Sequence, residues 1–219
     1  MFETVGMINR GTEAGELIYN FAKNPEIKTI VEIGTWNGLG TTKCLYEGII
    51  DSGKKDYLVL SLECNLGRYN EAKQNLLPLA NFNLIYGTVT TFDEILPKMN
   101  SENEKRAAAN LPWVYEESAH IKAAPLVLDM IPEKIDFIIF DGGEQSSSFD
   151  FEKLHERAHY IYLDDTRDDM EVEHFGHVLK NSMQRRYVLE HPEKFRVIKD
   201  DQKLGSCGWF VCENLEFVK

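Results

Sequence analysis

Short apolar runs alternate with stretches of helical periodicity along most of the chain. Five of these runs cover residues 29–33, 57–62, 82–86, 135–140 and 160–163. Strands of this length that are separated by helices are typical of βαβ units, in which neighbouring strands are parallel. The alternation therefore predicts an α/β fold with a mostly parallel sheet.

Two further runs, residues 195–198 and 207–212, bring the expected number of strands to seven. They flank a turn at residues 203–206 and lie close enough to form a hairpin, so we expect the last strand to be antiparallel. Helices should cover both faces of this seven-stranded sheet. They are expected at residues 12–23, 41–50 and 71–77, in a segment that reaches about His159, and in a segment that carries Val172, Phe175, Leu179 and Met183.

The composition fits a single folded domain that spans residues 1–219. The chain has 24 Lys and Arg against 36 Asp and Glu, a net charge of −12 that repels polyphosphates, so we expect no nucleic-acid substrate. The N-terminus has no basic block followed by an apolar block, and no apolar run is long enough to cross a membrane. The four cysteines form no CxxC pair, and we interpret them as reduced thiols. A cytoplasmic protein is the expectation.

Residues 100–134 interrupt the alternation and are interpreted as an insertion. A charged stretch at residues 101–106 is followed by Trp113, Tyr115 and His120 among apolar residues. Long loops inside a compact domain are uncommon unless they have a function. We therefore predict a lid or substrate-binding segment whose aromatic residues face the substrate; the alternative is a disordered surface excursion.

A glycine turn follows the first expected strand. Residues 32–40 read EIGTWNGLG, and Trp36 occupies the position at which a dinucleotide-binding turn needs a glycine. That glycine lets the backbone approach a pyrophosphate, so the tryptophan argues against a dinucleotide. A ligand without phosphates, such as S-adenosylmethionine, tolerates the larger side chain.

Polar residues also follow the second and third strands. Glu63 follows the second run and lies 25 residues beyond Gly38, which is near the spacing of an acid that binds ribose hydroxyls. The alternative interpretation is a surface glutamate at a strand end. Thr88, after the third run, is placed to flank an adenine ring. These positions predict a nucleoside site at the carboxyl edge of the sheet.

These motifs resemble those of class I S-adenosylmethionine-dependent methyltransferases. The turn Glu32–Gly38 is similar to their first motif, and Glu63 with Cys64 and Asn65 to their second. The upstream segments at residues 9–11 and 15–17 resemble the segment of catechol-type O-methyltransferases that crosses over the cofactor. The resemblance covers roughly residues 9–170 without the insertion, and it implies a Rossmann-like fold. The residues expected to bind S-adenosylmethionine are Glu32, Gly34, Thr35, Trp36, Gly38, Glu63, Cys64, Thr88 and Asp141.

Three aspartates follow the fourth and fifth strands. Asp141, Asp164 and Asp165 should converge, since those strands are expected to be neighbours, and like charges this close need either a shared proton or a cation. Three carboxylates suit Mg²⁺. They also resemble the site of metal-dependent O-methyltransferases, including the macrocin and mycinamicin sugar methyltransferases and the cephalosporin hydroxylase-like group, in which the metal holds two neighbouring oxygens of the acceptor. Alternatively, Asp165 caps a helix or Asp141 contacts the amino group of the cofactor.

The general base is left open by the sequence. Glu144 stands three residues after Asp141, where catechol-type enzymes have a lysine, and is our first candidate; His155, His159 and deprotonation by the metal are the others. Residues 155–159, HERAH, also match the H-E-x-x-H signature of zinc peptidases. The adjoining strand and the lack of a further histidine motif make that context poor, and we interpret both histidines as solvated helix residues.

The sequence thus predicts a cytoplasmic O-methyltransferase that uses S-adenosylmethionine and Mg²⁺. The expected acceptor is a small molecule, sugar-like or otherwise with adjacent hydroxyls. Two alternatives remain: a zinc hydrolase that uses His155, Glu156 and His159, and a member that binds the cofactor without transferring a methyl group. We expect no membrane partner, and we predict a homodimer.

Overall fold

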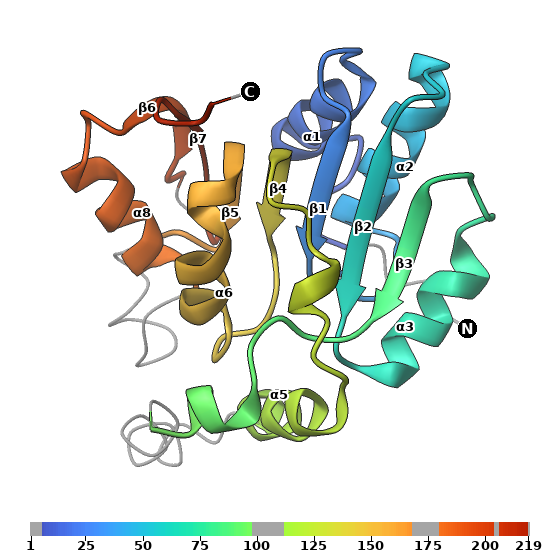
Figure 1. Ribbon diagram of the computed structural model, residues 1–219, viewed down its shortest axis with the longest axis vertical. Coiled ribbons are helices and arrows are strands. Elements are labelled where there is room, and N and C mark those ends of the chain that lie inside the picture. Colours follow the sequence, from blue (N-terminus) through green and yellow to red (C-terminus); the bar gives the residue numbers. More distant parts are fainter. Residues whose placement is uncertain (1–5, 98–111, 168–179, 204–205, 219) are drawn as a thin grey trace.

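The computed structural model describes residues 6–97, 112–167, 180–203 and 206–218 (Figure 1). A seven-stranded sheet forms its centre. The strands are β1 (Thr29–Ile33), β2 (Leu58–Glu63), β3 (Phe82–Tyr86), β4 (Ile135–Phe140), β5 (Ala158–Asp164), β6 (Phe195–Asp201) and β7 (Trp209–Asn214). The helices are α1 (Glu13–Lys23), α2 (Thr41–Ser52), α3 (Leu66–Asn75), α5 (Pro112–Ala123), α6 (Ser147–Leu154) and α8 (Ser182–Glu190), with 3-10 turns at Leu128–Met130 and His155–Arg157.

The strand order is β3-β2-β1-β4-β5-β7-β6. Strands β1 to β5 pair in parallel, and β7 is antiparallel to both β5 and β6. The predicted α/β, Rossmann-like sheet with an antiparallel last strand is therefore confirmed. The chain winds from β1 toward β3 on one side and from β4 toward β6 on the other, so the order reverses between β1 and β4. Ligands of such sheets bind in the crevice beyond the carboxyl ends of the strands at this reversal.

Successive residues of each central strand pack into opposite cores, because side chains alternate across a sheet. In β1, Ile30 packs in the cluster with Ile18 of α1 and Leu45 of α2, whereas Val31 packs in the cluster with Phe151 of α6 and Val188 of α8. The sheet is thus covered by helices on both faces (Figure 1). Helix α5 covers neither face and lies instead at the carboxyl ends of the strands (Figure 1).

The helix that was predicted to reach about His159 ends earlier, so its predicted C-terminal boundary is wrong. Helix α6 stops at Leu154, a 3-10 turn follows, and β5 already begins at Ala158, which pairs with Ile135 of β4. Pairing with a neighbouring strand overrides the local helical pattern here. Of the residues predicted to form the last amphipathic helix, Met183 lies in α8, and Val172, Phe175 and Leu179 lie outside the described residues.

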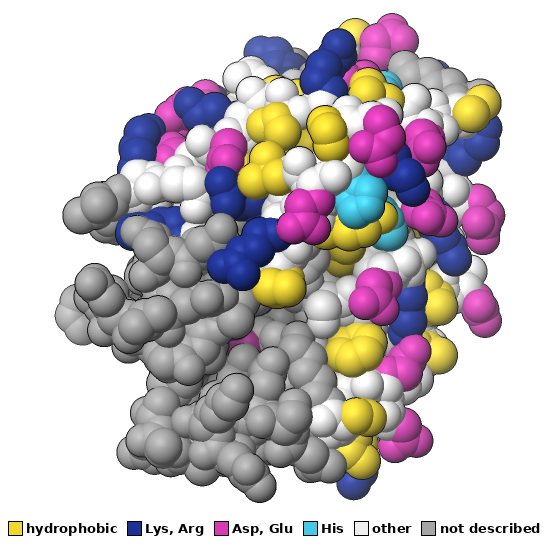
Figure 2. Space-filling view, turned by 90° about the vertical axis from the view of Figure 1, so that its left-hand side faces the viewer, with side chains coloured by type: hydrophobic (Ala, Val, Ile, Leu, Met, Phe, Trp, Pro, Cys, Tyr) yellow, Lys and Arg dark blue, Asp and Glu magenta, His cyan; other side chains and the backbone are white. Residues whose placement is uncertain are grey.

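The surface over α8 and β6 mixes charged side chains of both signs with hydrophobic ones, some of which adjoin one another (Figure 2). Its exposed large hydrophobic residues are Met183, Leu189, Val197 and Ile198. All four cysteines are free, in agreement with the expected thiols. In the described part of the chain, no helix has the length and apolar character that a membrane span requires.

Candidate active site

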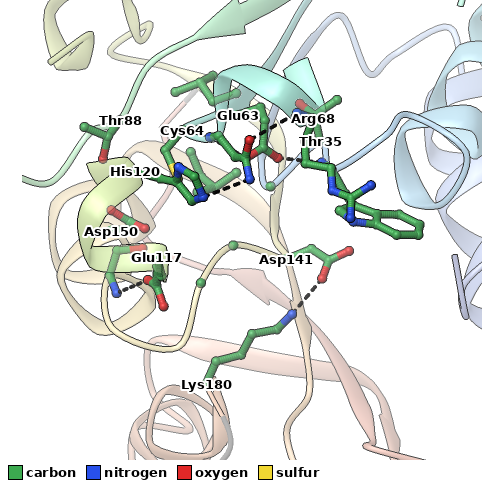
Figure 3. A pocket seen from close by; sticks show the side chains of 18 of the residues that line it. Thr35, Glu63, Cys64, Arg68, Thr88, Glu117, His120, Asp141, Asp150 and Lys180 are labelled. Carbon is green, nitrogen blue, oxygen red and sulfur yellow. Dashed lines mark hydrogen bonds and ion pairs between the residues drawn. The ribbon is translucent and has the colours of Figure 1, made fainter. Parts of the chain in front are cut away.

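A cavity of about 580 Å³ opens at the carboxyl ends of the strands (Figure 3). Its lining comes from the ends of β1 to β5 and the segments that follow them, and from α5. It also includes residues 6–8 near the N-terminus, Asp150 of α6, and Lys180, which lies two residues before α8. The size is within the range of small-molecule sites, and the location is the one that the strand reversal predicts.

The turn after β1 forms one wall because a glycine lets it contact the loop after β4. Gly34 has φ +102°, and a Cβ there would lie 2.2 Å from the carbonyl oxygen of Asp141. Trp36 has φ +50°, a conformation that glycine adopts more easily. Thr35 and Trp36 line the cavity with Gly34, whereas Gly38 packs against α3 and is not among the lining residues.

The second wall is built around Glu63, at the end of β2. One carboxylate oxygen accepts the backbone N–H of Trp36 at 2.7 Å, and the other accepts that of Asn65 at 2.8 Å. The side chain is nearly buried, and burial raises the pKa of Glu63 to about 7, although the two backbone N–H groups act in the opposite direction. Glu63 is therefore fixed in place, with lone pairs left for a ligand.

Glu32 does not line the cavity. Its carboxylate is fully buried below the turn, where it accepts the hydroxyls of Thr42, at 2.8 Å, and of Ser61. Burial raises the pKa of Glu32 to about 7. The structure gives this residue contacts that join β1, β2 and α2 and support the turn from below.

Cys64 and Thr88 line the cavity as the sequence predicted, but α5 supplies the side chains that face them (Figure 3). His120 of α5 is 3.0 Å from the side-chain amide of Asn65. His120 thus lines the cavity next to Asn65, and its contact with the acceptor stays a prediction. The side chains of Trp113 and Tyr115 lie outside the described residues, and the function of the insertion as a lid stays a prediction.

Glu117 fastens α5 to the loop after β4. Its carboxylate accepts the backbone N–H groups of Gln145 at 3.0 Å and Ser146 at 3.1 Å, next to the start of α6. A Cβ on Gly143 would lie 2.0 Å from a Glu117 oxygen, so this approach requires a glycine. Burial raises the pKa of Glu117 to about 7 and that of the neighbouring cavity residue Asp150 to about 6.

Asp141, Asp164 and Asp165 lie together, as the sequence predicted, but they surround an ammonium group. Nζ of Lys180 is 2.7 Å from Asp141, 3.1 Å from Asp165 and 3.4 Å from Asp164. Burial alone would lower the pKa of Lys180, but the carboxylates of Asp141, Asp165 and Asp164 raise it well above its ordinary value. Burial, with the neighbouring carboxylates of Asp165 and Asp141, also raises the pKa of Asp164.

This arrangement does not fit the predicted Mg²⁺. That ion needs its oxygen ligands at about 2.0–2.1 Å in octahedral geometry, and here a positive nitrogen lies among the same oxygens. Across the described residues, no group of three or more His, Cys, Asp and Glu side chains is arranged to hold a metal ion. We therefore derive no step through a metal.

The side chains that the sequence offered as the general base do not line the cavity. Glu144 is absent from its walls. His155 is buried, stacks on Phe151 at 4.4 Å and contacts the Phe151 carbonyl oxygen through Nδ1, so its interpretation as a solvated residue is wrong. His159 lies in β5, with Nε2 3.1 Å from Glu213. The two histidines are thus not one turn apart on a helix, which a zinc peptidase site requires.

Sequence reasoning missed four residues that line the cavity: Arg68, Glu117, Asp150 and Lys180. None of these residues ends a strand or lies in the turn directly after one, which is the signal that located the other candidates. The lining holds seven acidic side chains and two basic ones. The acids are Glu63, Glu116, Glu117, Asp141, Asp150, Asp164 and Asp165; the bases are Arg68 and Lys180.

No protein-family model and no curated protein matches the chain. Solved structures do match. A candidate O-methyltransferase from Klebsiella pneumoniae has a TM-score of 0.58 at 16% identity, over 96% of this chain and 83% of that one. The chain thus has a methyltransferase fold.

Two further structures share this fold. An O-methyltransferase from Bacillus cereus, in complex with S-adenosylhomocysteine, has a TM-score of 0.55 at 16% identity, over 96% of this chain and 84% of that one. An rRNA methylase from Streptococcus thermophilus has a TM-score of 0.52 at 15% identity, over 96% of this chain and 100% of that one. Since the names of these proteins imply different acceptors, the fold alone does not identify an acceptor.

Proposed function

We propose that this protein transfers the methyl group of S-adenosylmethionine to a hydroxyl of a small acceptor, with sugar-like molecules as the first candidates. The position of Glu63 carries the proposal. Each of its oxygens accepts one backbone N–H at the wall of the cavity, so the remaining lone pairs are available for the two ribose hydroxyls. The glycine turn packs closely against the loop after β4, and Trp36 occupies the position at which a dinucleotide-binding turn needs a glycine.

The charge of the lining supports a cationic ligand. Acidic side chains outnumber basic ones around the cavity, so a ligand with a sulfonium and an ammonium group is attracted, whereas a pyrophosphate is repelled. S-adenosylmethionine supplies a methyl group on a positively charged sulfur: the bond from carbon to the acceptor oxygen forms as the bond from carbon to sulfur breaks. Asp141, at the end of β4 and on the cavity, is our candidate to accept the hydroxyl proton.

Titration calorimetry with S-adenosylhomocysteine tests the ligand. We expect saturable binding to the wild type and a loss of at least about tenfold in affinity for Glu63→Ala, because hydrogen bonds to a charged group are removed. Glu152→Ala, which changes an exposed residue of α6, is the matched control and should bind like the wild type. Absence of binding to the folded wild type would contradict the proposal.

Mass analysis of products tests the transfer itself. Incubation with S-adenosylmethionine and a panel of small hydroxylated molecules should yield a product that is heavier by one CH₂ group. Binding of S-adenosylhomocysteine without any such product across sugars, phenols and hydroxy acids would favour the alternative of a member that binds the cofactor without methyl transfer.

We propose a cytoplasmic protein that acts on a small molecule and not on nucleic acid, and these proposals rest on the sequence. The net charge of −12 argues against a nucleic-acid substrate, and the thiols are consistent with the cytoplasm. The exposed hydrophobic residues of α8 and β6 are the surface on which we would seek a homodimer contact. Sedimentation analysis of the purified protein measures its oligomeric state directly.

A further inference from the structure

Lys180 makes an ion pair with each of the three aspartates that close one end of the cavity. Its side chain is only 9% exposed, and its Nζ lies 2.7–3.4 Å from one carboxylate oxygen of Asp141, Asp164 and Asp165. An ammonium group has three N–H donors, which equals the number of carboxylates around it. The ammonium therefore donates to Asp141 and makes ion pairs with Asp164 and Asp165, and it offsets part of the negative charge that would otherwise attract a cation.

The next residue fixes the position of this lysine. Asn181 is fully buried, and its side-chain amide donates to the carbonyl oxygen of Phe140 at 2.9 Å and to that of Asp164 at 2.7 Å. Its backbone N–H donates to the carbonyl oxygen of Asp165 at 3.2 Å. Asn181 thus joins the ends of β4 and β5, and Lys180 is held over both.

A divalent cation and this ammonium exclude each other. Oxygens that bind Mg²⁺ lie about 2.0–2.1 Å from the ion, so a cation bound by the three oxygens that Nζ contacts would occupy the space of Nζ. Two positive groups in that space would repel strongly, because the site is largely shielded from water. Only displacement of the Lys180 side chain would free these oxygens for a metal.

We propose that Lys180 stands in for the divalent cation, so that methyl transfer at this site is independent of metal ions. The exclusion of a cation rests on the ion pairs of Lys180, whereas its consequence for methyl transfer rests on the proposed function. Lys180 acts here as a positioning residue: it holds Asp141 and Asp165 at the cavity, where Asp141 meets the acceptor hydroxyl. The acceptor then needs no pair of adjacent oxygens to bind a metal, which widens the substrate class to single hydroxyls.

Manganese binding, measured by electron paramagnetic resonance on chelator-treated full-length protein, tests the exclusion without any substrate. The wild type should show no saturable Mn²⁺ site, whereas Lys180→Ala should bind Mn²⁺ saturably, and Lys180→Ala combined with Asp141→Asn should lose that site. A merely structural lysine would not change metal binding in this way. Lys153→Ala is the matched control, because Lys153 pairs with the single carboxylate of Glu94 at 2.8 Å and its removal should create no site.

Two results would overturn the inference: saturable Mn²⁺ binding by the wild type that Asp141→Asn abolishes, or a folded Lys180→Ala protein that binds no Mn²⁺. If Lys180→Ala does not fold, Lys180→Met and the wild-type titration still decide. A parallel titration of the wild type with S-adenosylhomocysteine should give affinities within about twofold in Mg²⁺ and in chelator. No binding in either buffer would contradict the proposed function while leaving the Mn²⁺ result valid, so the two failures are distinguishable.

Discussion

Gly34 and Gly53 both have positive φ, but only Gly34 lies against another segment. A Cβ on Gly34 would lie 2.2 Å from the Asp141 carbonyl oxygen, whereas a Cβ on Gly53, at the end of α2, would meet nothing within 4 Å. Substituting alanine at Gly53 therefore changes only the energy of the backbone conformation. The same substitution at Gly34 also disturbs the close contact that shapes the cavity.

We expect Gly53→Ala to lower the free energy of unfolding by about 1 kcal/mol, the cost of positive φ for a residue with a Cβ. Gly34→Ala should lower it by about 3 kcal/mol or more, because the loop after β4 must also move. Urea denaturation followed by circular dichroism measures both. Equal losses in the two variants would show that the contact between the turn and this loop contributes nothing to stability.

The same residues explain how far the sequence could predict the site. The sequence could predict the positions at the carboxyl ends of the strands, because each ends a strand or lies within three residues after one, and parallel strands bring these ends to one edge. These positions are Gly34, Trp36, Glu63, Asp141, Asp164 and Asp165. Lys180 was not predictable, since its place depends on the contacts of Asn181 with two strand ends far away in the chain. Because the sequence did not reveal this lysine, the three aspartates were predicted to bind Mg²⁺.

At the scale of elements, the central strands were predictable and some boundaries were not. β1, β3 and β4 have the bounds that the apolar runs predict. By contrast, α3 begins at Leu66, ahead of the predicted residue 71, because the side chain of Asn65 accepts the N–H groups of Gly67 and Arg68 and caps the helix. Strand β5 begins earlier than its apolar run because pairing with β4 extends it. Caps and strand pairing are contacts that periodicity does not report.

Helix α5 gives an element-scale prediction, because Glu117 is its anchor to the start of α6. Glu117→Ala leaves two backbone N–H groups without this acceptor, at a cost of roughly 1–3 kcal/mol for each buried group that water cannot reach. We expect faster amide hydrogen exchange across residues 112–123 and weaker binding of S-adenosylhomocysteine.

Glu116→Ala provides the comparison for hydrogen exchange, because Glu116 is the exposed neighbour of Glu117 on the same helix; it also lines the cavity, so it is not a control for ligand binding. In Glu116→Ala, the amides of α5 should exchange at the wild-type rate. In both variants, the amides of the central strands should also exchange at the wild-type rate. Unchanged exchange of α5 in Glu117→Ala would mean that apolar contacts such as Ile121, which is buried, hold the helix without the carboxylate.

At the scale of the whole molecule, buried acids set the dependence of stability on pH. Burial raises the pKa of Glu32 and Glu117 to about 7 and that of Asp150 to about 6. A carboxyl group with a higher pKa in the folded than in the unfolded state binds more protons when folded, so its stabilising effect is present below the unfolded value and is lost as the pH rises through the folded value. Glu94 acts in the opposite direction: Lys153 and the Thr91 N–H outweigh burial and lower its pKa to about 2.

We therefore expect the ligand-free protein to be more stable near pH 5.5 than near pH 8, an interval that spans the raised values. Each pKa unit corresponds to about 1.4 kcal/mol, so Glu32→Gln, which stays neutral and can still accept the hydroxyls of Thr42 and Ser61, should reduce the fall by about 1–3 kcal/mol. Urea denaturation at both pH values measures the difference, and Glu152→Gln, on the exposed side of α6, should leave it unchanged. Glu94 does not oppose the effect in this interval, because its carboxyl group is ionised in both states above about pH 5.5. A wild type whose stability rises from pH 5.5 to 8 would therefore show that the carboxylates below and beside the cavity are ionised in the folded protein at little cost.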